Sequence, residues 1–512
     1  MRNSEARSAR RNAPETMRSA SARAASLLIG LLLLACGGGG SSVAANGGMS
    51  GTGISQGSIS SFGSIFVNGV EWDLSSATIE IDGAGASESD LRIGMVVRVE
   101  GTFDAGNLTG SADRVVFDDS IEGPLEDDPV ETVPGLERRF TVLGQTVFMN
   151  AETTVFEDGA SFADLGRDDV VEVSGFVDPA GAIQALRVEL VGQLPGNDEV
   201  ELRGLVANLV TDPIGSGSFE LGTILVQFDA ATQFVDVTRG TLENGDLVEV
   251  EGTLRANGVE IDADQVELET EGLGSGEAER VELEGIVADC PQSSDFCVGA
   301  IPVDASSASF EPAGFMPAPG NWVEVEGSLA AGVVVAERVE LEEQNQENAK
   351  ISAAATSVDP GSSTLVILGV TVRADPETRI EDRSSIDDAN FTFGEIRPGD
   401  FLEIRGFDEG GDMVLASEIE REDASAGADD VELEGTVTAL DPITPALSIL
   451  GRPIPLDAET LYFDSTGQPR TEEQFFRNPG DVMLGDIVEA TDESALDLSS
   501  LSEADTVEIE DP

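Results

Sequence analysis

Apolar and polar residues alternate one by one over most of the chain beyond residue 50. The stretch from Gly245 to Gly252 (G-D-L-V-E-V-E-G) is typical, because Leu and Val alternate with acidic residues between two glycines. Successive side chains of a β-strand point to opposite faces, so this alternation predicts strands that are buried on one side, and the glycines predict turns. No long helical pattern follows residue 50. The sequence therefore predicts an all-β protein.

Three short markers recur in the same order at spacings of ~70 to 80 residues, which indicates internal repeats. The first marker is the glycine-bounded strand just described, the second is an Ala that opens another alternating strand, and the third is Thr-x-Phe or a similar triplet. The first marker begins at Gly94, Gly166, Gly245, Gly320, Gly399 and, in a degenerate copy, Gly485. The second begins at Ala112, Ala185, Ala263, Ala336, Ala416 and Ala504, and the third begins at Thr154, Thr232 and, in a related form, Thr460.

Each repeat has room for about five short strands, too few for a sandwich of seven and enough for a small closed barrel of the OB type. We therefore predict a tandem array of six small five-stranded OB-like barrels. The repeats span residues 53–118, 119–193, 199–270, 280–342, 350–422 and 430–512. The alternative is one large sandwich built from all the strands. Gly-rich or polar linkers at 272–279 and 343–349 favour separate barrels.

Two phrases of the first repeat resemble a known bacterial domain family. They run from Ser61 to Val70 (S-F-G-S-I-F-V-N-G-V) and from Leu91 to Gly101 (L-R-I-G-M-V-V-R-V-E-G), and both are similar to domain-of-unknown-function family 5666. The other repeats share the first two markers, so the resemblance covers most of the chain. It implies an exported protein with repeated domains, and it brings no established catalytic residues.

The N-terminal residues have a different pattern, in which several arginines precede an apolar run. That run, from Ala24 to Ala35, is shorter than the ~20 residues that cross a bilayer and ends on small residues. Residues 1–35 are therefore predicted to be a signal peptide, whose true start is either Met1 or Met17.

The signal peptide ends in L-L-A-C, which resembles the lipobox of bacterial lipoproteins and implies that Cys36 is the lipid attachment site. Residues 36–52 follow as a flexible Gly/Ser tether. Gly37 stands where an Asp tends to hold such proteins in the inner membrane, so the resemblance implies the outer membrane, with the chain facing the periplasm or the cell surface.

A formal charge of −70, from 98 acidic and 28 basic residues, narrows the range of partners. Such a surface repels phosphate backbones, so we expect no nucleic-acid partner and no binding to anionic membrane surfaces beyond the lipid anchor. Acidic turns such as Asp408 to Asp412 lack the ligand order of an EF-hand. We expect no specific metal site, and divalent cations such as calcium are expected to bind weakly and act by screening.

The chain contains no histidine, which removes the usual general base and every Ser-His or Cys-His arrangement. Pairs of carboxylates have no diagnostic weight in so acidic a chain, so we predict no catalytic residues and no cofactor. The expected function is that of a non-enzymatic outer-membrane lipoprotein, a modular spacer or binding protein for a protein or glycan ligand. A calcium-dependent adhesin or matrix component, and an envelope enzyme with a site between repeats, remain alternatives.

Cys290 and Cys297 lie between the first two predicted strands of the fourth repeat. An exported protein folds in an oxidising compartment, where two nearby cysteines form a disulfide more readily than they stay as free thiols. A metal site is disfavoured because only two thiols and no histidine are available. We therefore predict a disulfide that closes this hairpin.

Overall fold

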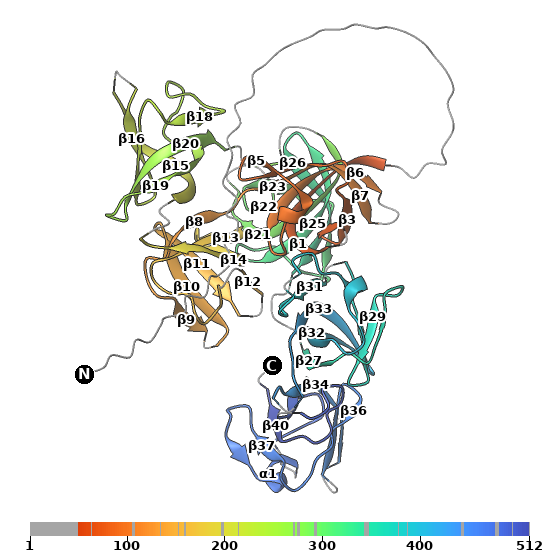
Figure 1. The fold of residues 1–512 in the computed structure, drawn as a ribbon. Coiled ribbons are helices and arrows are strands. Elements are labelled where there is room, and N and C mark those ends of the chain that lie inside the picture. Colours follow the sequence, from red (N-terminus) through yellow and green to blue (C-terminus); the bar gives the residue numbers. More distant parts are fainter. Residues whose placement is uncertain are drawn as a thin grey trace, which may run out of the picture. The chain divides into compact units, whose positions relative to one another are not determined.

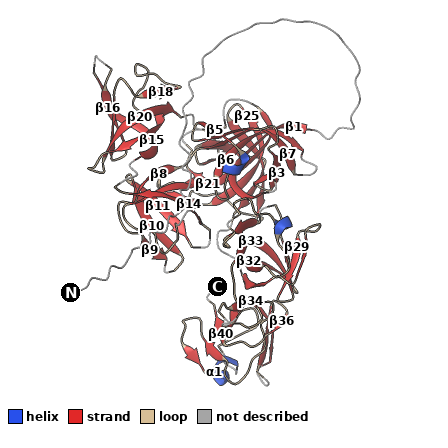
Figure 2. Cartoon of the chain, in the orientation of Figure 1, coloured by secondary structure: helices blue, strands red, loops and turns tan. Residues whose placement is uncertain are grey.

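The computed structural model describes residues 50–510 apart from short gaps at 63, 105–107, 134, 152, 158–159, 196–198, 213–214, 270–271, 274–276, 291–293, 343–347, 377, 387, 427, 442–444, 477–480 and 494. The predicted signal peptide and Cys36 lie outside the described residues. The described residues are mostly strands, and the one α-helix among them, α1 (Glu472–Phe476), has five residues (Figure 2). In this part of the chain, no helix is long and apolar enough to cross a membrane.

Each of the first three repeats forms a small barrel of its own (Figure 1). Repeat 1 contains β1 (Ser50–Phe62), β2 (Ile65–Val67), β3 (Val70–Asp73), β4 (Thr78–Ile81), β5 (Ala84–Ala86), the 3-10 turn η1 (Glu88–Asp90), β6 (Val96–Asp104) and β7 (Thr109–Phe117). Repeat 2 contains β8 (Ile121–Pro124), β9 (Val130–Val133), β10 (Glu137–Val142), β11 (Gln145–Asn150), β12 (Val155–Glu157), β13 (Asp169–Val177) and β14 (Ile183–Gln193). Repeat 3 contains β15 (Glu199–Thr211), β16 (Gly217–Leu221), β17 (Ile224–Phe228), β18 (Gln233–Val235), β19 (Leu247–Leu254) and β20 (Glu260–Leu268).

The last three repeats follow the same order of strands. Repeat 4 contains β21 (Ala278–Ala288), β22 (Phe296–Val298), β23 (Ile301–Asp304), β24 (Ser309–Glu311), β25 (Trp322–Ala330) and β26 (Val333–Leu341). Repeat 5 contains β27 (Ala349–Ala354), β28 (Ser357–Asp359), β29 (Thr364–Ile367), β30 (Val370–Arg373), β31 (Arg379–Asp382), the 3-10 turn η2 (Phe393–Glu395), β32 (Phe401–Gly410) and β33 (Met413–Glu422). Repeat 6 contains β34 (Val431–Asp441), β35 (Ala446–Ile449), β36 (Arg452–Pro453), β37 (Leu461–Phe463), β38 (Pro469–Arg470), the helix α1, β39 (Ile487–Asp492) and β40 (Thr506–Ile509).

Repeat 3 shows how a barrel of this chain closes. Strands β15, β16 and β17 form an antiparallel meander, β17 pairs in parallel with β20, β20 pairs with β19, and β19 returns to β15. The apolar half of each alternating strand fills the interior, where Phe219, Val226, Val250 and Val266 are fully buried. The predicted fold class, an array of small five-stranded barrels of the OB type, is confirmed.

The first two sequence markers are the two sides of one β-bulge. Gly252, which closes the first marker of repeat 3, lies opposite Ala263, which opens the second, and the register shifts between Glu251 and Gly252. A Cβ at Gly252 would stand 2.4 Å from the carbonyl oxygen of Asp262, so only glycine fits. The same pairing recurs at Gly101 and Ala112, Gly175 and Ala185, Gly327 and Ala336, and Gly406 and Ala416.

The third marker also serves the fold. The hydroxyl of Thr232 donates to the carbonyl oxygen of Ala263 at 2.8 Å, and thus ties the short strand β18 to the bulge. Thr154 and Thr378 make the same bond to the carbonyls of Ala185 and Ala416. The recurring polar residue of the marker is therefore a packing device.

The barrels join in pairs through their first strands, and we call each such junction a joint. Strand β8 pairs with β15 and thereby joins repeats 2 and 3, and β27 pairs with β34 and joins repeats 5 and 6, both in antiparallel fashion. Strands β1 and β21 pair in parallel and join repeats 1 and 4, which are far apart in sequence. Three continuous sheets result, one for each pair of barrels.

Candidate functional site

A row of glutamates crosses the joint of repeats 2 and 3. In register, Glu122 of β8 lies between Glu172 of β13 and Glu201 of β15, while Glu251 of β19 follows Glu201 and Glu189 of β14 follows Glu172. Residues directly opposite in antiparallel strands share one face of the sheet, about 4.5 to 5.5 Å apart at Cβ. These five side chains, the glutamate row, therefore crowd like charges onto one face.

A basic side chain reaches one end of the glutamate row, and a neutral amide reaches the other. Arg187, which is 1% exposed, binds Glu189 at 2.5 Å and Glu157 at 2.7 Å. At the other end, Gln265 donates a hydrogen bond to Glu251 at 2.9 Å. Among the described residues, no ion pair reaches the three central members, Glu122, Glu172 and Glu201.

Two aspartates complete this acidic site, one from repeat 1 and one that is the first residue of repeat 2. Asp82 lies in the turn between β4 and β5, and its Oδ1 accepts the backbone N–H of Asp119 at 3.1 Å. Asp119 lies two residues before the start of β8 and is 3% exposed, and its Oδ1 has no hydrogen-bond partner in the described part of the chain. Glu201 is 7% exposed, and its Oε1 likewise has no hydrogen-bond partner there.

Burial makes protons bind more tightly to these carboxylates. Burial, reinforced by the charges of Asp82 and other acidic neighbours, raises the pKa of Glu122 to about 7. Burial also raises the pKa of Asp119 well above its usual range, and the charge of Glu201 adds to the effect. The pKa of Glu201 is raised by burial and by the neighbouring charge of Glu249. These carboxylates therefore stay protonated and neutral to a higher pH than free carboxylates do.

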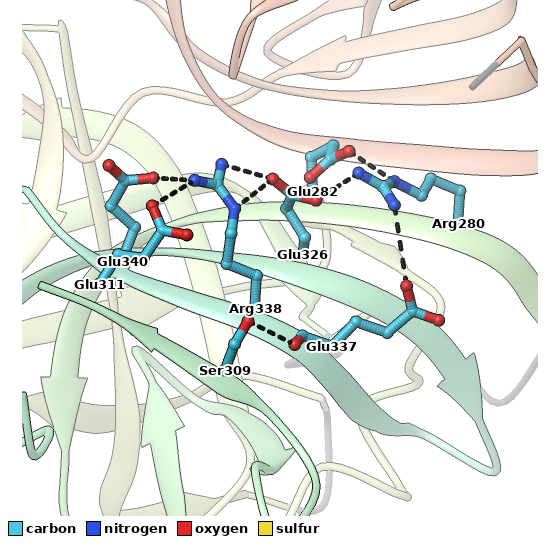
Figure 3. A network of polar contacts seen from close by, with 8 residues as sticks. All are labelled: Arg280, Glu282, Ser309, Glu311, Glu326, Glu337, Arg338 and Glu340. Atoms are coloured by element: carbon cyan, nitrogen blue, oxygen red, sulfur yellow. Dashed lines mark hydrogen bonds and ion pairs between the residues drawn. The ribbon is translucent and has the colours of Figure 1, made fainter. Parts of the chain in front are cut away.

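Another acidic cluster, formed by Glu282, Glu324 and Glu326 in repeat 4, has carboxylate oxygens within 4.8 Å of one another. Figure 3 shows that two arginines hold it together. Arg280 binds Glu282 at 2.6 Å and Glu326 at 2.5 Å. Arg338 contacts three glutamates: Glu311, Glu326 and Glu340. This cluster is therefore an internal ion-pair network.

Two further clusters of glutamates also have basic partners. In repeat 5, Arg379 and Arg383 bind the cluster made of Glu381, Glu418 and Glu420. In repeat 6, the cluster is made of Glu432, Glu434 and Glu489, and Lys350 lies 3.1 Å from the Oε1 of Glu432. Each of these three compact clusters of glutamates is bound by at least one basic side chain. Among the described residues, the centre of the glutamate row has no such partner.

A small polar cleft of about 140 Å³ lies where repeats 1 and 4 meet. Its buried carboxylate, Glu284, accepts hydrogen bonds from the backbone N–H of Ser58 at 2.9 Å and from Nε1 of Trp322 at 3.1 Å. Burial raises the pKa of Glu284, and these hydrogen bonds oppose the rise. Because the carboxylate is satisfied from both barrels, it serves as a bridge between them.

The residues singled out in the sequence fall in three places. Cys36, the predicted lipid attachment site, lies outside the described residues. Cys290 and Cys297 are joined by a disulfide with their Cα atoms 5.1 Å apart, between β21 and β22. In the acidic turn that begins at the end of β32, Asp408 accepts the backbone N–H of Gly410 at 2.7 Å, as a solvated turn does.

The sequence did not single out the site at the glutamate row, because its members come from three repeats. One signal was present, since Glu201 belongs to the phrase V-E-L that opens repeats 3, 4 and 6. That phrase showed an acidic residue on the outer face of a first strand. It did not show which strand of another barrel would cover that face.

Comparison with known proteins identifies the domain family of this chain. Comparison with curated proteins gives no match. A solved structure titled "drosophila Unr CSD456" is 15% identical, with 44% of this chain and 97% of that chain covered and a TM-score of 0.11. The family described as "Domain of unknown function (DUF5666)" matches residues 54–115, 129–189, 203–267, 284–340 and 353–420, which is five of the six repeats. The resemblance seen in the sequence is thus confirmed, and the chain belongs to the DUF5666 family.

Proposed function

We propose that the protein is a non-enzymatic lipoprotein of the bacterial outer membrane, anchored through a lipid on Cys36. In this proposal its acidic barrels form a modular spacer or binding array of the cell envelope, with a protein or glycan as ligand. Its negative surface disfavours nucleic acid as a partner, because phosphate backbones carry the same charge.

One observation carries this proposal, namely that the recurring residues of the repeat are used by the fold itself. Thr232 ties a short strand to the bulge, Gly252 makes room for that bulge, and Arg280 and Arg338 bind the glutamates of repeat 4. An enzyme with one active site in each repeat would leave reactive side chains free at equivalent positions of the repeats. Here the recurring positions just named serve packing and internal ion pairs instead. This use supports a scaffold that presents surfaces.

The acidic site at the joint of repeats 2 and 3 favours a second candidate, a calcium-dependent adhesin or matrix component. Its central carboxylates, Glu122, Glu172 and Glu201, have no ion pair within the described residues, and carboxylate oxygen is the ligand that calcium prefers. The two candidates differ in whether calcium changes the stability of the array.

Replacement of the anchor residue tests the first candidate. The protein is expressed with its leader in a Gram-negative host, and membranes are separated and probed for incorporated radiolabelled fatty acid. We expect the wild-type protein in the outer-membrane fraction with label, and Cys36→Ser free of label and released or unprocessed. The Cys290→Ser/Cys297→Ser variant is the matched control and should remain labelled. Outer-membrane fractionation and labelling of Cys36→Ser like wild type would refute lipid anchoring at this residue.

A further inference from the structure

We propose that the joint of repeats 2 and 3 is a pH-sensitive switch, which is stable when the glutamate row is protonated and weakens when the row ionises. The proposal goes beyond the suggested role as an envelope array and does not depend on it. A switch of this kind would let the acidity of the surroundings decide how firmly two neighbouring barrels are held together.

The switch consists of glutamates that stand directly opposite one another where two barrels join. Glu122 of β8 is paired with Glu201 of β15, which belongs to the next barrel, and on its other side with Glu172 of β13. Opposite residues of antiparallel strands share one face, and like charges at such positions destabilise the strand pair. When these side chains are ionised, their repulsion therefore opposes the pairing that joins the barrels.

The joint is short, so one pair of charges makes up a large part of it. Strands β8 and β15 pair through two residue pairs, Glu122 with Glu201 and Ile121 with Leu202. The joint of repeats 5 and 6 has three such pairs, and the joint of repeats 1 and 4 has four. Half of the pairing between repeats 2 and 3 thus sets carboxylate against carboxylate.

The charged groups around the row do not offset its charge. Those that act on it or lie beside it are the acidic Asp82, Asp118, Asp119, Glu199 and Glu249 and the basic Arg187 and Arg203. Both arginines are engaged, since Arg187 binds Glu157 and Glu189 and Arg203 binds Glu249. Within the described part of the chain, no ion pair reaches the three central glutamates. A proton is therefore the simplest way to neutralise them.

Burial adds to the preference for the protonated form. Glu201 is 7% exposed, and a charged carboxylate that is removed from water without a partner is costly. Burial, reinforced by acidic neighbours, raises the pKa of Glu122 from 4.5 to about 7 and that of Glu172 to about 8. A group whose pKa is raised in the closed joint stabilises that joint fully below the ordinary pKa, and this contribution is lost as the pH rises through the raised value. The joint should accordingly weaken from mildly acidic to mildly alkaline pH.

The experiment compares hydrogen exchange of the whole mature protein, in detergent and EDTA, between wild type and variants at the same pH. Glu122→Gln and Glu201→Gln keep the shape of the side chain and cannot ionise. At pH 8, each should protect the β8 and β15 amides about tenfold better than wild type, since one unit of pKa is a factor of ten. At pH 5 the difference should shrink to about threefold or less. Glu243→Gln, at an exposed position of repeat 3, is the matched control and should exchange like wild type.

Three results would overturn the proposal. Equal or weaker protection of β8 and β15 in both glutamine variants at pH 8 would mean that the charge of the row does not oppose the joint. A gain of the same size at pH 5 and pH 8 would assign the effect to the packing of the amide instead of the loss of a charge. An equal gain in Glu243→Gln, or at the amides of β27 and β34, would show a general effect of net charge. None of these results bears on the lipid anchor, which is tested by fractionation.

Discussion

A methyl group at the bulge glycine should destabilise a barrel, because backbone atoms stand too close to the new Cβ. In repeat 3, a Cβ on Gly252 would stand 2.4 Å from the carbonyl oxygen of Asp262 and 2.9 Å from both the Cα of Ala263 and the Cγ2 of Ile261. Real Cβ atoms essentially never approach other heavy atoms to within 3.0 Å. Two of the three neighbours are backbone atoms of β20, so the strand itself must move to accommodate Gly252→Ala.

The size of the effect follows from two opposing contributions. Forcing an extra methyl group into a packed site costs about 1 to 3 kcal/mol. Replacing glycine by alanine also restricts the unfolded chain, which offsets roughly 0.4 to 1 kcal/mol of that cost. We expect Gly252→Ala to lower the free energy of unfolding of repeat 3 by about 1 to 2 kcal/mol, a factor of roughly 5 to 30 in its opening equilibrium.

Hydrogen exchange followed by mass spectrometry resolves one barrel within the intact array. Peptides from β19 and β20 should exchange about 5 to 30 times faster in Gly252→Ala than in wild type. Gly240 lies in the same repeat, and a Cβ there meets nothing within 4 Å. Gly240→Ala should therefore exchange at the wild-type rate or more slowly. If Gly252→Ala and Gly240→Ala behave alike, the bulge does not require glycine and our account of the repeat markers is refuted.

Two other perturbations act on the disulfide and on the glutamate row. Cys290→Ser/Cys297→Ser should destabilise repeat 4 by roughly 2 to 3 kcal/mol, because the disulfide restricts the unfolded chain even though it closes a short loop. Hydrogen exchange of the β22 and β23 amides measures this loss of stability, and unchanged exchange rates would contradict the prediction. In EDTA, β8 and β15 should be better protected at pH 5 than at pH 8. Burial raises the pKa of Glu122 from 4.5 to about 7, so its contribution to stability is complete below the lower value and is lost as the pH rises through the upper one. Protection that increases with pH would contradict this assignment.

The fold could be predicted because the repeat carries its own structural constraints. Alternation marked the buried face of each strand, and the bulge demanded Gly at one position and favoured Ala opposite, as at Gly252 and Ala263. Repeat 6 shows the converse. Its first marker is degenerate. Ala490 of β39 pairs with Val507 of β40, and the register does not shift there. The sixth barrel thus forms without the glycine bulge, and the family match ends before it.

The pairing of barrels could not be predicted in the same way. Alternation shows which face of a strand is buried, but it does not identify the chain segment that covers the other face. Repeat 1 joins repeat 4 through β1 and β21, where Ile54 lies beside Val281 and packs against the core of repeat 4. Ile54 belongs in sequence to the first barrel, so no local pattern marks it as part of the fourth.

The joint of repeats 5 and 6 shows how this chain balances charge with its own residues. There Lys350, the only lysine of the chain, stands opposite Glu434 on one side and Arg405 on the other. At the joint of repeats 2 and 3, the strand pairing sets Glu122 opposite Glu201 instead. Both joints use antiparallel first strands, so their backbones impose the same proximity on the side chains. One joint meets it with a basic residue of the chain, Lys350. The other has carboxylates at its centre, where burial raises the pKa of Glu122 to about 7, so the stability of that joint should depend on protonation.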